Sequence, residues 1–476
     1  MTTGTFPSVF KRALVHPIYK SGDRDSVSNY RPISVLSTLS KIIEKILNNR
    51  LLNYLNSNKI IVDNQYGFRQ NKKTEDAVLE LTSSVAKNIN NKLKTIGIFL
   101  DLSKAFDTVS IPLLLMKLEL IGIRGLPLNI FKSYLTNRTQ SVTIGGYTSG
   151  LEHLNCGVPQ GSVLGPTLFL IYINDLCKLS PSNAKIITYA DDTVLLIHGK
   201  SWDDARSFAV SALQTIMNWL ANNLLTLNLE KTKFITFSPR IASQPPSSFS
   251  LSARLCSTTQ NCNCIAIKRT DFIKYLGVYV DSMLTWKEQI RSLVPRVRKL
   301  IFVFKHLRTA ANLQTLKMVY FALAHSMLTY CVTAWGGSVK SLMLPLERSQ
   351  RAVLKVMTRK PILFPTKELY DLCKLPTVRH SFLLSTILRK HAELPFDAVS
   401  IARIRRSDRV CHIEVARFEI LKRQYHFISP VLYNRVNRIL NVNPVTLRTC
   451  KLVTNQWLHT LNYEELELMA KPHNCK

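Results

Sequence analysis

The chain has 476 residues, 46% of them apolar, and its 63 Lys and Arg outnumber 31 Asp and Glu to give a formal net charge of +32. This length and apolar content predict a globular protein with two or three compact units. No apolar run is long enough to cross a bilayer, and residues 1–20 contain no apolar core of signal-peptide length. Ten scattered cysteines exclude a disulfide scaffold, and the close pair Cys262 and Cys264 lacks the spacing of a zinc site. We therefore expect a nuclear or cytoplasmic protein that is not secreted.

The excess of positive charge indicates the chemistry of the partner. A surface with so many cations attracts polyanions, and nucleic acid is the expected one. Its affinity should fall as salt rises, because binding releases counterions from the phosphates. An anionic membrane surface is the alternative, but no basic amphipathic anchor with exposed Trp or Phe is found in the sequence. We expect a nucleic-acid partner and no membrane partner.

The first 95 residues predict two helices among basic loops. The first is predicted from apolar residues at helical spacing, namely Ile42, Ile43, Ile46, Leu47 and Leu51. The second spans residues 75–92, from Glu75 through Val78, Leu81 and Val85.

A buried strand is predicted next, because residues 95–100 form an apolar run. Asp101 follows this run directly. An acid at the end of a buried strand can face the turn of a neighbouring strand. The alternative is that Asp101 caps a helix starting at Leu102 or Ser103.

Asp191 and Asp192 lie side by side between two further apolar runs, residues 186–187 and 194–197. Two short strands with a tight turn would place both carboxylates at the tip of a hairpin. Adjacent carboxylates repel each other, and Mg²⁺ suits them because it takes oxygen ligands and shares them with phosphates. With Asp101 facing them across a sheet, three carboxylates would hold two metal ions, which is the chemistry of a nucleotide polymerase. The alternative is that both are ordinary turn residues.

The middle of the chain alternates predicted helices and loops. Pro166 is a good first helical residue, and residues 167–173 predict a buried helix behind it. A second helix is expected over 203–223, a loop over the Ser-, Pro- and Asn-rich residues 241–265, and a hairpin over 271–286. Further helices are expected over 312–335 and 341–358.

A basic amphipathic helix is predicted after residue 290. Its apolar face is formed by Leu293, Val297, Leu300, Ile301, Phe304 and Leu307. Its cations, with no acid between them, are Arg291, Arg296, Arg298, Lys299, Lys305 and Arg308. This pattern favours a helix that binds the phosphate backbone of a template–primer duplex. The alternative is a solvated basic face over a core stripe, which leaves the one-sided charge unexplained.

Several short sequence blocks follow one another in a fixed order. They occupy residues 6–18, 29–34, 65–69, 99–107, 157–166, 189–192, 227–233, 275–278 and 284–286. Together they resemble the reverse transcriptase of non-LTR retrotransposons, of the LINE-like, Jockey type. The resemblance is strong over residues 5–290 and looser over 291–400.

The resemblance implies an α+β fold of the right-hand polymerase type. Fingers are expected over residues 1–95, a palm with an antiparallel sheet over 96–280, and a helical thumb over 281–380, the polymerase domain itself covering about 5–280. The chain would begin inside the fingers, so an N-terminal truncation is expected. Residues 381–476 are basic, with Arg403, Arg405, Arg406 and Arg409 close together, and have no assigned role.

The resemblance also assigns catalytic roles. Asp101, Asp191 and Asp192 would ligate two Mg²⁺, for which Mn²⁺ is a substitute. Phe106 would be the steric gate that excludes a 2′-hydroxyl, and the alternative for this ring is plain core packing. Lys231 would protonate the leaving pyrophosphate, and its alternative is a solvated lysine.

Four further residues are expected at the nucleotide. Arg69, and in second place Arg31, would bind the triphosphate through paired guanidinium donors, although either can be a surface charge. Gln160 would contact the sugar and phosphate of the nucleotide, and Gly161 would let the backbone approach it. The alternative for the last two is a simple Gly-Pro loop.

The predicted function is therefore that of a nucleotidyltransferase, an RNA-directed DNA polymerase of a non-LTR retrotransposon. Its expected partners are an RNA template, a DNA primer, dNTPs and a separate endonuclease. One alternative is a catalytically silent or domesticated RNA-binding derivative of the fold, which the +32 charge would serve equally well. Another is an RNA-dependent RNA polymerase, which the bulky Phe106 disfavours.

Overall fold

The structure is a computed structural model that describes residues 3–20, 22–179, 181–253, 265–394, 410–443 and 445–472. Cys262, Cys264 and the cluster of Arg403, Arg405, Arg406 and Arg409 lie outside the described residues. The chain divides into two compact units. The first unit comprises Met1–Lys73, Ile96–Phe234 and Ser247–Arg269, and the second comprises Thr74–Thr95, Ile235–Pro246 and Thr270–Lys476.

A six-stranded sheet carries the centre of the first unit. Its strand order is β10-β11-β9-β3-β8-β7. In chain order the strands are β3 (Lys94–Leu100), β7 (Ala184–Tyr189), β8 (Asp192–Gly199), β9 (Lys233–Phe237), β10 (Leu251–Ala253) and β11 (Ile265–Arg269). The β7–β8 pair is antiparallel, whereas β11 runs parallel to β9, so the sheet is mixed rather than purely antiparallel. The apolar run of β3 is buried, as predicted.

A second sheet in the first unit is built on a hairpin near the N-terminus. It contains β1 (Arg12–Tyr19), β2 (Tyr30–Val35), β4 (Arg138–Ile144), β5 (Tyr147–Thr148) and β6 (Glu152–Leu154). Strands β1 and β2 pair antiparallel with Ile18 opposite Arg31, and β4 runs parallel to β1.

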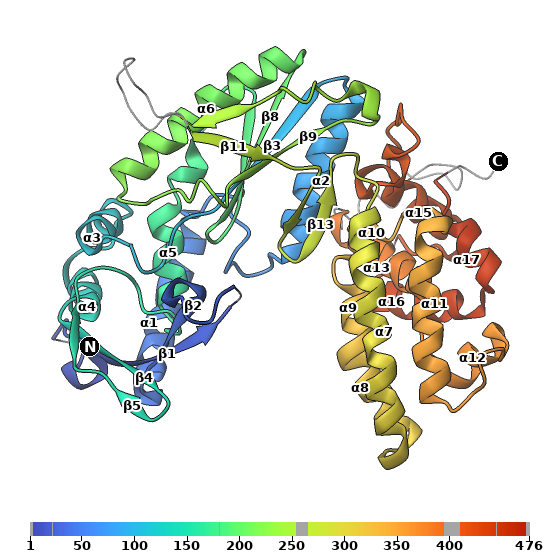
Figure 1. The fold of residues 1–476 in the computed structure, drawn as a ribbon, viewed down its shortest axis with the longest axis horizontal. Coiled ribbons are helices and arrows are strands. Elements are labelled where there is room, and N and C mark those ends of the chain that lie inside the picture. Colours follow the sequence, from blue (N-terminus) through green and yellow to red (C-terminus); the bar gives the residue numbers. More distant parts are fainter. Residues whose placement is uncertain are drawn as a thin grey trace. The chain divides into compact units, whose positions relative to one another are not determined.

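The α-helices among the described residues of the first unit are α1 (Thr38–Ser57), α3 (Ile111–Leu120), α4 (Gly125–Leu135), α5 (Gly165–Ile173) and α6 (Trp202–Asn222). Helix α6 packs along the six-stranded sheet (Figure 1). It begins with a capping box in which Ser201 and Asp204 each accept the backbone N–H of the other, and its buried face includes Ala209, Leu213 and Ile216. Helix α5 is buried along its length except at Pro166, which confirms the helix predicted there.

The second unit is mostly helical. It contains α2 (Thr74–Asn90), β12 (Phe272–Tyr275), β13 (Val278–Asp281), α7 (Lys287–Ala310), α8 (Leu313–Tyr320), the π-helix η5 (Phe321–His325), α9 (Ser326–Thr329), α10 (Val332–Trp335), α11 (Lys340–Met357), α12 (Thr366–Cys373), α13 (Val378–Glu393), α15 (Tyr425–Leu440), α16 (Leu447–Thr460) and α17 (Tyr463–Met469). The long helices α7 and α11 lie side by side (Figure 1). Among the described helices, none has both the length and the apolar character that a bilayer-spanning segment needs.

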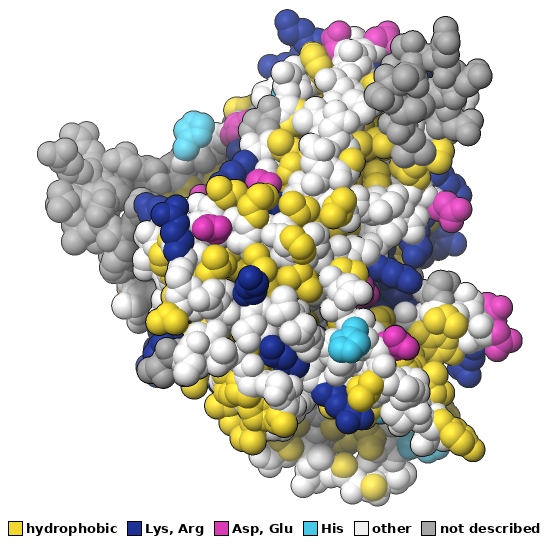
Figure 2. Space-filling model, turned by 90° about the vertical axis from the view of Figure 1, so that its left-hand side faces the viewer, with side chains coloured by type: hydrophobic (Ala, Val, Ile, Leu, Met, Phe, Trp, Pro, Cys, Tyr) yellow, Lys and Arg dark blue, Asp and Glu magenta, His cyan; other side chains and the backbone are white. Residues whose placement is uncertain are grey.

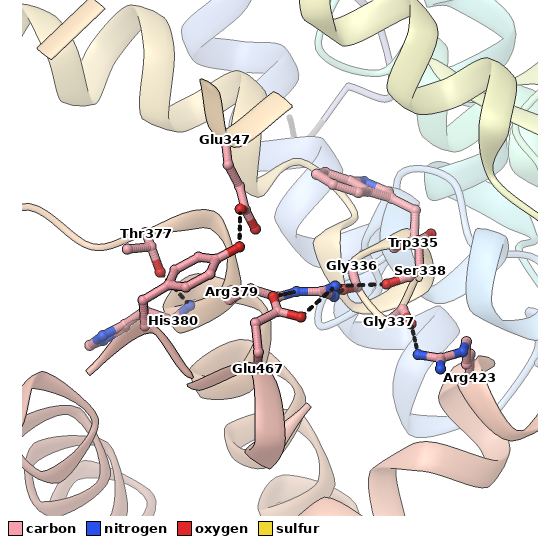
Figure 3. Close-up of polar contacts among 11 residues, drawn as sticks. Trp335, Gly336, Gly337, Ser338, Glu347, Thr377, Arg379, His380, Arg423 and Glu467 are labelled. Carbon is pink, nitrogen blue, oxygen red and sulfur yellow. Dashed lines mark hydrogen bonds and ion pairs between the residues drawn. The ribbon is translucent and has the colours of Figure 1, made fainter. Parts of the chain in front are cut away.

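A buried ion pair holds the C-terminal helices of the second unit together. Figure 3 shows Arg379 of α13 reaching Glu467 of α17, with Nε 2.5 Å from Oε1. The same guanidinium donates to the carbonyls of Gly336 and Ser338 at 2.6 and 2.8 Å. Arg379 Nη2 also lies 3.4 Å from Glu467 Oε2. Because the Arg379 side chain is only 2% exposed, these four oxygens replace the water that it has lost.

The predicted α+β class is confirmed by this mixture of helices and sheets. The loop expected over residues 241–265 is wrong in part, because Leu251–Ala253 forms β10 and pairs with β11. The fingers, palm and thumb boundaries stay predictions. The compact units do not follow them one for one, since α2 groups with the second unit.

Candidate active site

The two neighbouring aspartates lie at the tip of a hairpin, as predicted. Tyr189 pairs with Asp192 at the end of the β7–β8 ladder, which leaves Ala190 and Asp191 as a two-residue turn. Ala190 has a left-handed φ of 56° and is 4% exposed. The turn is therefore a buried, conformationally restricted support for Asp191.

Asp101 follows β3, the strand next to β8 in the six-stranded sheet. Its backbone carbonyl accepts the N–H of Asn228 at 2.8 Å, and its own N–H donates to Thr232 Oγ1 at 3.4 Å. The alternative that Asp101 caps a helix at Leu102 or Ser103 is wrong, because the next helix begins at Ile111 and is capped by Ser110.

The three carboxylates share one electrostatic environment. Desolvation raises the pKa of Asp191 above its usual 3.8, and the negative charge of Asp101 raises it further. Desolvation, followed by the charges of Asp191 and Asp101, raises the pKa of Asp192 to about 6, although the residue keeps a solvent-exposed surface. Like charges held this close disfavour full ionisation, and a bound cation would relieve the repulsion.

Two cations of the β1–β2 hairpin act against this repulsion. The charges of Arg31 and Lys20 both lower the pKa values of Asp191 and Asp192. The two residues come together because Ile18 pairs with Arg31 across the hairpin and the N–H of Lys20 donates to Asn29 at 2.9 Å. Lys20 has no sequence signal of its own, because only the strand register brings it to the carboxylates.

The donor set fits a hard divalent cation in its chemistry. Three carboxylates supply oxygen ligands, and their mutual repulsion is the kind that Mg²⁺ neutralises. Across the described ranges, however, no group of three or more His, Cys, Asp or Glu side chains is arranged as a ready set of metal ligands. Metal binding by Asp101, Asp191 and Asp192 therefore stays a prediction.

The aromatic ring predicted as a steric gate is part of a stack. Phe106 lies face to face with Phe169 of α5, with ring centroids 4.2 Å apart, and meets the edge of Phe68 at 6.4 Å. It is half-buried against the core of the first unit. Core packing thus accounts for one face of the ring, and the gate role stays a prediction.

The loop before α5 is held by its own neighbours. Gln160 Nε2 donates to both carboxylate oxygens of Asp107 at 2.9 Å, and the Gln160 carbonyl accepts the N–H of Ser34 at 2.7 Å. Gly161 has φ +116°, and a Cβ there would lie 2.5 Å from the Ser34 carbonyl oxygen. The close approach to β2 therefore already explains the glycine, and nucleotide contacts by Gln160 and Gly161 stay predictions.

The side chain of Arg69 contacts residues of its own loop. Its Nη1 donates to the carbonyls of Val62 at 2.7 Å and Gln65 at 3.4 Å, and lies 3.7 Å from Asp63. Arg31 is exposed, and its charge acts on Asp191 and Asp192, whereas Arg69 makes its hydrogen bonds within its own loop. A triphosphate contact by either one stays a prediction.

The comparisons with known proteins agree with this geometry. The family described as reverse transcriptase (RNA-dependent DNA polymerase) matches residues 18–280, more than half of the chain. The chain belongs to the reverse transcriptase family. The predicted resemblance to non-LTR retrotransposon polymerases is confirmed as well.

Two relatives of this reverse transcriptase come from Drosophila melanogaster. The RNA-directed DNA polymerase from mobile element jockey is 31% identical over 403 residues, which cover 83% of this chain and 42% of the relative. The probable RNA-directed DNA polymerase from transposon BS is 29% identical over 402 residues, covering 81% of this chain and 43% of the relative. The chain thus spans less than half the length of these curated relatives.

Solved structures of low similarity were also found. The telomerase from Candida albicans in complex with the TWJ fragment of telomeric RNA is 12% identical, covers 96% of this chain and 66% of its own, and has a TM-score of 0.45. The apo telomerase from Candida tropicalis is 11% identical, covers 97% and 69%, and has a TM-score of 0.42.

Two further predicted parts of the reverse transcriptase can be located. Lys231 is exposed, and its N–H donates to Asn228 Oδ1 at 3.2 Å, so it lies on the segment that also contacts Asp101. The basic helix is α7, with Leu293, Val297 and Phe304 buried as predicted. The general-acid role of Lys231 stays a prediction.

The cationic side chains of α7 differ in their solvent exposure. Arg291, Arg296, Arg298, Lys299 and Lys305 are exposed. Arg308 is half-buried and donates to the Val356 carbonyl of α11 at 3.2 Å, so it braces the helix pair instead of standing free. On the face of the molecule in Figure 2, Lys and Arg side chains form separate spots among apolar and neutral ones.

The raised pKa of Asp192 predicts a change in stability. A carboxyl whose folded-state pKa of about 6 exceeds its usual 3.8 binds its proton more tightly in the folded protein than in the unfolded one. It therefore destabilises the fold above a pH of about 6, and this destabilisation decreases as pH falls from about 6 to 3.8. Asp192→Asn should therefore raise the unfolding midpoint by about 1–3 °C near pH 7.5, a small gain because solvent screens the exposed group. Differential scanning fluorimetry without divalent metal, near pH 7.5 and pH 4, measures this, and a lower midpoint near pH 7.5 would contradict it.

Proposed function

We propose that the chain is an RNA-directed DNA polymerase that extends a primer 3′-hydroxyl with dNTPs on an RNA template, using two Mg²⁺. The observation that carries this proposal is the electrostatic coupling of Asp101, Asp191 and Asp192 at neighbouring strand ends. A costly group of like charges is of no use to a protein that only binds RNA.

Different residues would take different roles in the reaction. Asp101, Asp191 and Asp192 would hold the metal ions, which when bound supply activation of the hydroxyl and neutralisation of the phosphate charge. Lys20 and Arg31, whose charges already act at the carboxylates, would bind and orient the triphosphate. We assign the sugar contact to Phe106 and proton delivery to pyrophosphate to Lys231.

The wider assignments belong to the same proposal. The exposed cations of α7 would bind the sugar–phosphate backbone of the RNA template and DNA primer. A separate endonuclease would supply the primer end, and we propose a nuclear or cytoplasmic location. Mn²⁺ would replace Mg²⁺ in the same oxygen-ligand set.

Primer extension tests the proposal directly. Purified protein is incubated with oligo(dT) on poly(rA), dTTP and Mg²⁺, beside a reaction with EDTA and a fluorescence measurement of duplex binding. Extension that needs the metal is the expected result. Tight, salt-sensitive binding without extension would reject the polymerase and favour the RNA-binding alternative, which the +32 charge supports.

The steric gate makes a separate prediction. Phe106→Val should raise the incorporation of ribonucleotides relative to deoxynucleotides by about 10- to 100-fold, because the smaller side chain leaves room for a 2′-hydroxyl. The measurement is the ratio of kcat/KM for UTP and dTTP. Phe208→Val, which shortens another half-buried Phe packed on the same core, serves as the control. An unchanged ratio in Phe106→Val would leave core packing as the role of the ring.

A further inference from the structure

A short segment before Arg69, residues 64–67, runs along the end of β7 and is called the strap here. The N–H of Tyr66 donates to the Thr188 carbonyl at 2.8 Å, and the N–H of Thr188 donates to the Asn64 carbonyl at 3.0 Å. Gln65 and Thr188 form an isolated parallel bridge, and both are 0% exposed. Gln65 therefore lies opposite Thr188, which is two residues before Ala190, the first residue of the turn.

The Gln65 side chain reaches the turn itself. Its Oε1 accepts the N–H of Ala190 at 3.0 Å and the N–H of Gly67 at 2.8 Å. Ala190 is buried, and its N–H lies in a left-handed turn where a missing acceptor would leave an unsatisfied donor. One amide oxygen therefore joins the strap to the residue that precedes Asp191.

Gly67 of the strap lies too close to the turn for any side chain. A Cβ added at Gly67 would lie 2.3 Å from the Ala190 nitrogen and 2.9 Å from the Tyr189 carbonyl carbon. The strap and the turn thus meet backbone to backbone. A shift of the turn in this direction is blocked by the strap, and a shift away from it breaks the Gln65 hydrogen bond.

The choice of glutamine at this position is informative. The Gln65 Nε2 is buried and has no hydrogen-bond partner among the described residues, which is a cost that Met of similar length would avoid. Packing alone would therefore favour an apolar side chain. An oxygen acceptor is required for a different reason, because the N–H groups of Gly67 and Ala190 both donate to this one atom.

We infer that Gln65 is a positioning residue that fixes the Ala190–Asp191 turn, and with it the carboxylate of Asp191, against the strap formed by residues 64–67. It touches neither the nucleotide nor the metal in this proposal and acts through the backbone of Ala190. The inference rests on the proposed polymerase for its kinetic consequence, but its structural part does not depend on activity.

Two substitutions separate the acceptor from the packing. Gln65→Met keeps the length of the side chain and loses the oxygen, whereas Gln65→Glu keeps the oxygen. Hydrogen exchange of the peptide that contains Ala190 is measured by mass spectrometry. Gln65→Met should speed this exchange at least about tenfold, since a buried N–H loses its partner, and Gln65→Glu should leave it within about threefold of the wild type. Gln214→Met on the exposed face of α6 is the control.

Gly67→Ala gives an independent check, because it displaces the turn without removing the oxygen. It too should speed exchange in the turn peptide. Faster exchange spread evenly over the first unit, or an unchanged turn in Gln65→Met, would overturn the inference.

The kinetic arm separates this inference from the proposed function. In Gln65→Met, kcat for primer extension should fall at least about tenfold and the Mg²⁺ concentration at half-maximal rate should rise, while KM for the duplex stays unchanged. A wild type that fails to extend a primer would reject the polymerase, whereas the exchange data would still decide the role of Gln65. A fall in kcat without any change in turn exchange would overturn the inference and leave the polymerase standing.

Discussion

Primer extension is expected to fall by about 10³-fold or more in Asp191→Asn, and by a similar factor in Asp101→Asn. Each change removes one negative oxygen ligand from the coupled group, and several kcal/mol of transition-state stabilisation depend on the metal ions that this group would hold. The two variants should keep the hairpin, because the β7–β8 ladder and the Asp101 backbone contacts do not involve the carboxylates. Single-turnover extension rates with saturating dTTP are the measurement.

The control for this prediction is Asp203→Asn, which makes the same chemical change at an exposed position in the first turn of α6. Its extension rate should stay within about twofold of the wild type, because exposed charges contribute little. Binding of the template–primer duplex should be unchanged in all three variants. Retained extension in Asp191→Asn would reject the assignment of the site, while a loss of duplex binding would show that the change had disturbed more than the chemistry.

Local sequence patterns were sufficient for the parts of the site that lie on single elements. The apolar run of β3 ending at Asp101, the two-residue turn before Asp192 and the buried helix behind Pro166 are each encoded by consecutive residues. Strand burial, turn chemistry and helix capping act over a few positions, so they can be read from one sequence.

The remaining contacts of the site depend on register and packing between distant segments. Lys20 reaches the carboxylates only because β1 and β2 pair with Ile18 opposite Arg31. Gln65 and Ala190 are far apart in the sequence and meet through a single isolated bridge beside the ladder. The one sequence signal for this contact is a glutamine two residues before Gly67, and this pattern is too common to predict a contact by itself.

Long-range polar contacts join α2 to the rest of the second unit. The sequence places this helix among the predicted fingers, but Asp76 of α2 is bound by Arg389 at 2.6 Å and Asn90 accepts the N–H of Arg417 at 2.8 Å. These partners come from residues after 380, for which the sequence predicts no role. The described part of the C-terminal region is therefore a structural component of the second unit.

The buried pair of Arg379 and Glu467 has the largest expected effect on stability. Arg379 fills a space between α13, α17 and the Gly336–Ser338 backbone, where it is 2% exposed and makes four hydrogen bonds. Removing one partner of such a pair leaves a charge and several carbonyl oxygens without compensation. The cost of an uncompensated buried charge exceeds the cost of losing the pair as a whole.

Arg379→Met should therefore lower the free energy of unfolding of the second unit by about 3–5 kcal/mol, measured by urea unfolding followed through tryptophan fluorescence, to which the buried Trp335 beside this network contributes. Arg379→Met with Glu467→Met should recover much of the loss, because both charges are then gone. Glu347→Gln is the matched control, since burial raises the pKa of this neighbouring carboxyl and its Oε1 has no hydrogen-bond partner in the described residues. Removing that charge should leave stability unchanged or slightly higher at neutral pH. A double variant as unstable as Arg379→Met would show that packing of the long side chain, rather than the ion pair, stabilises these helices.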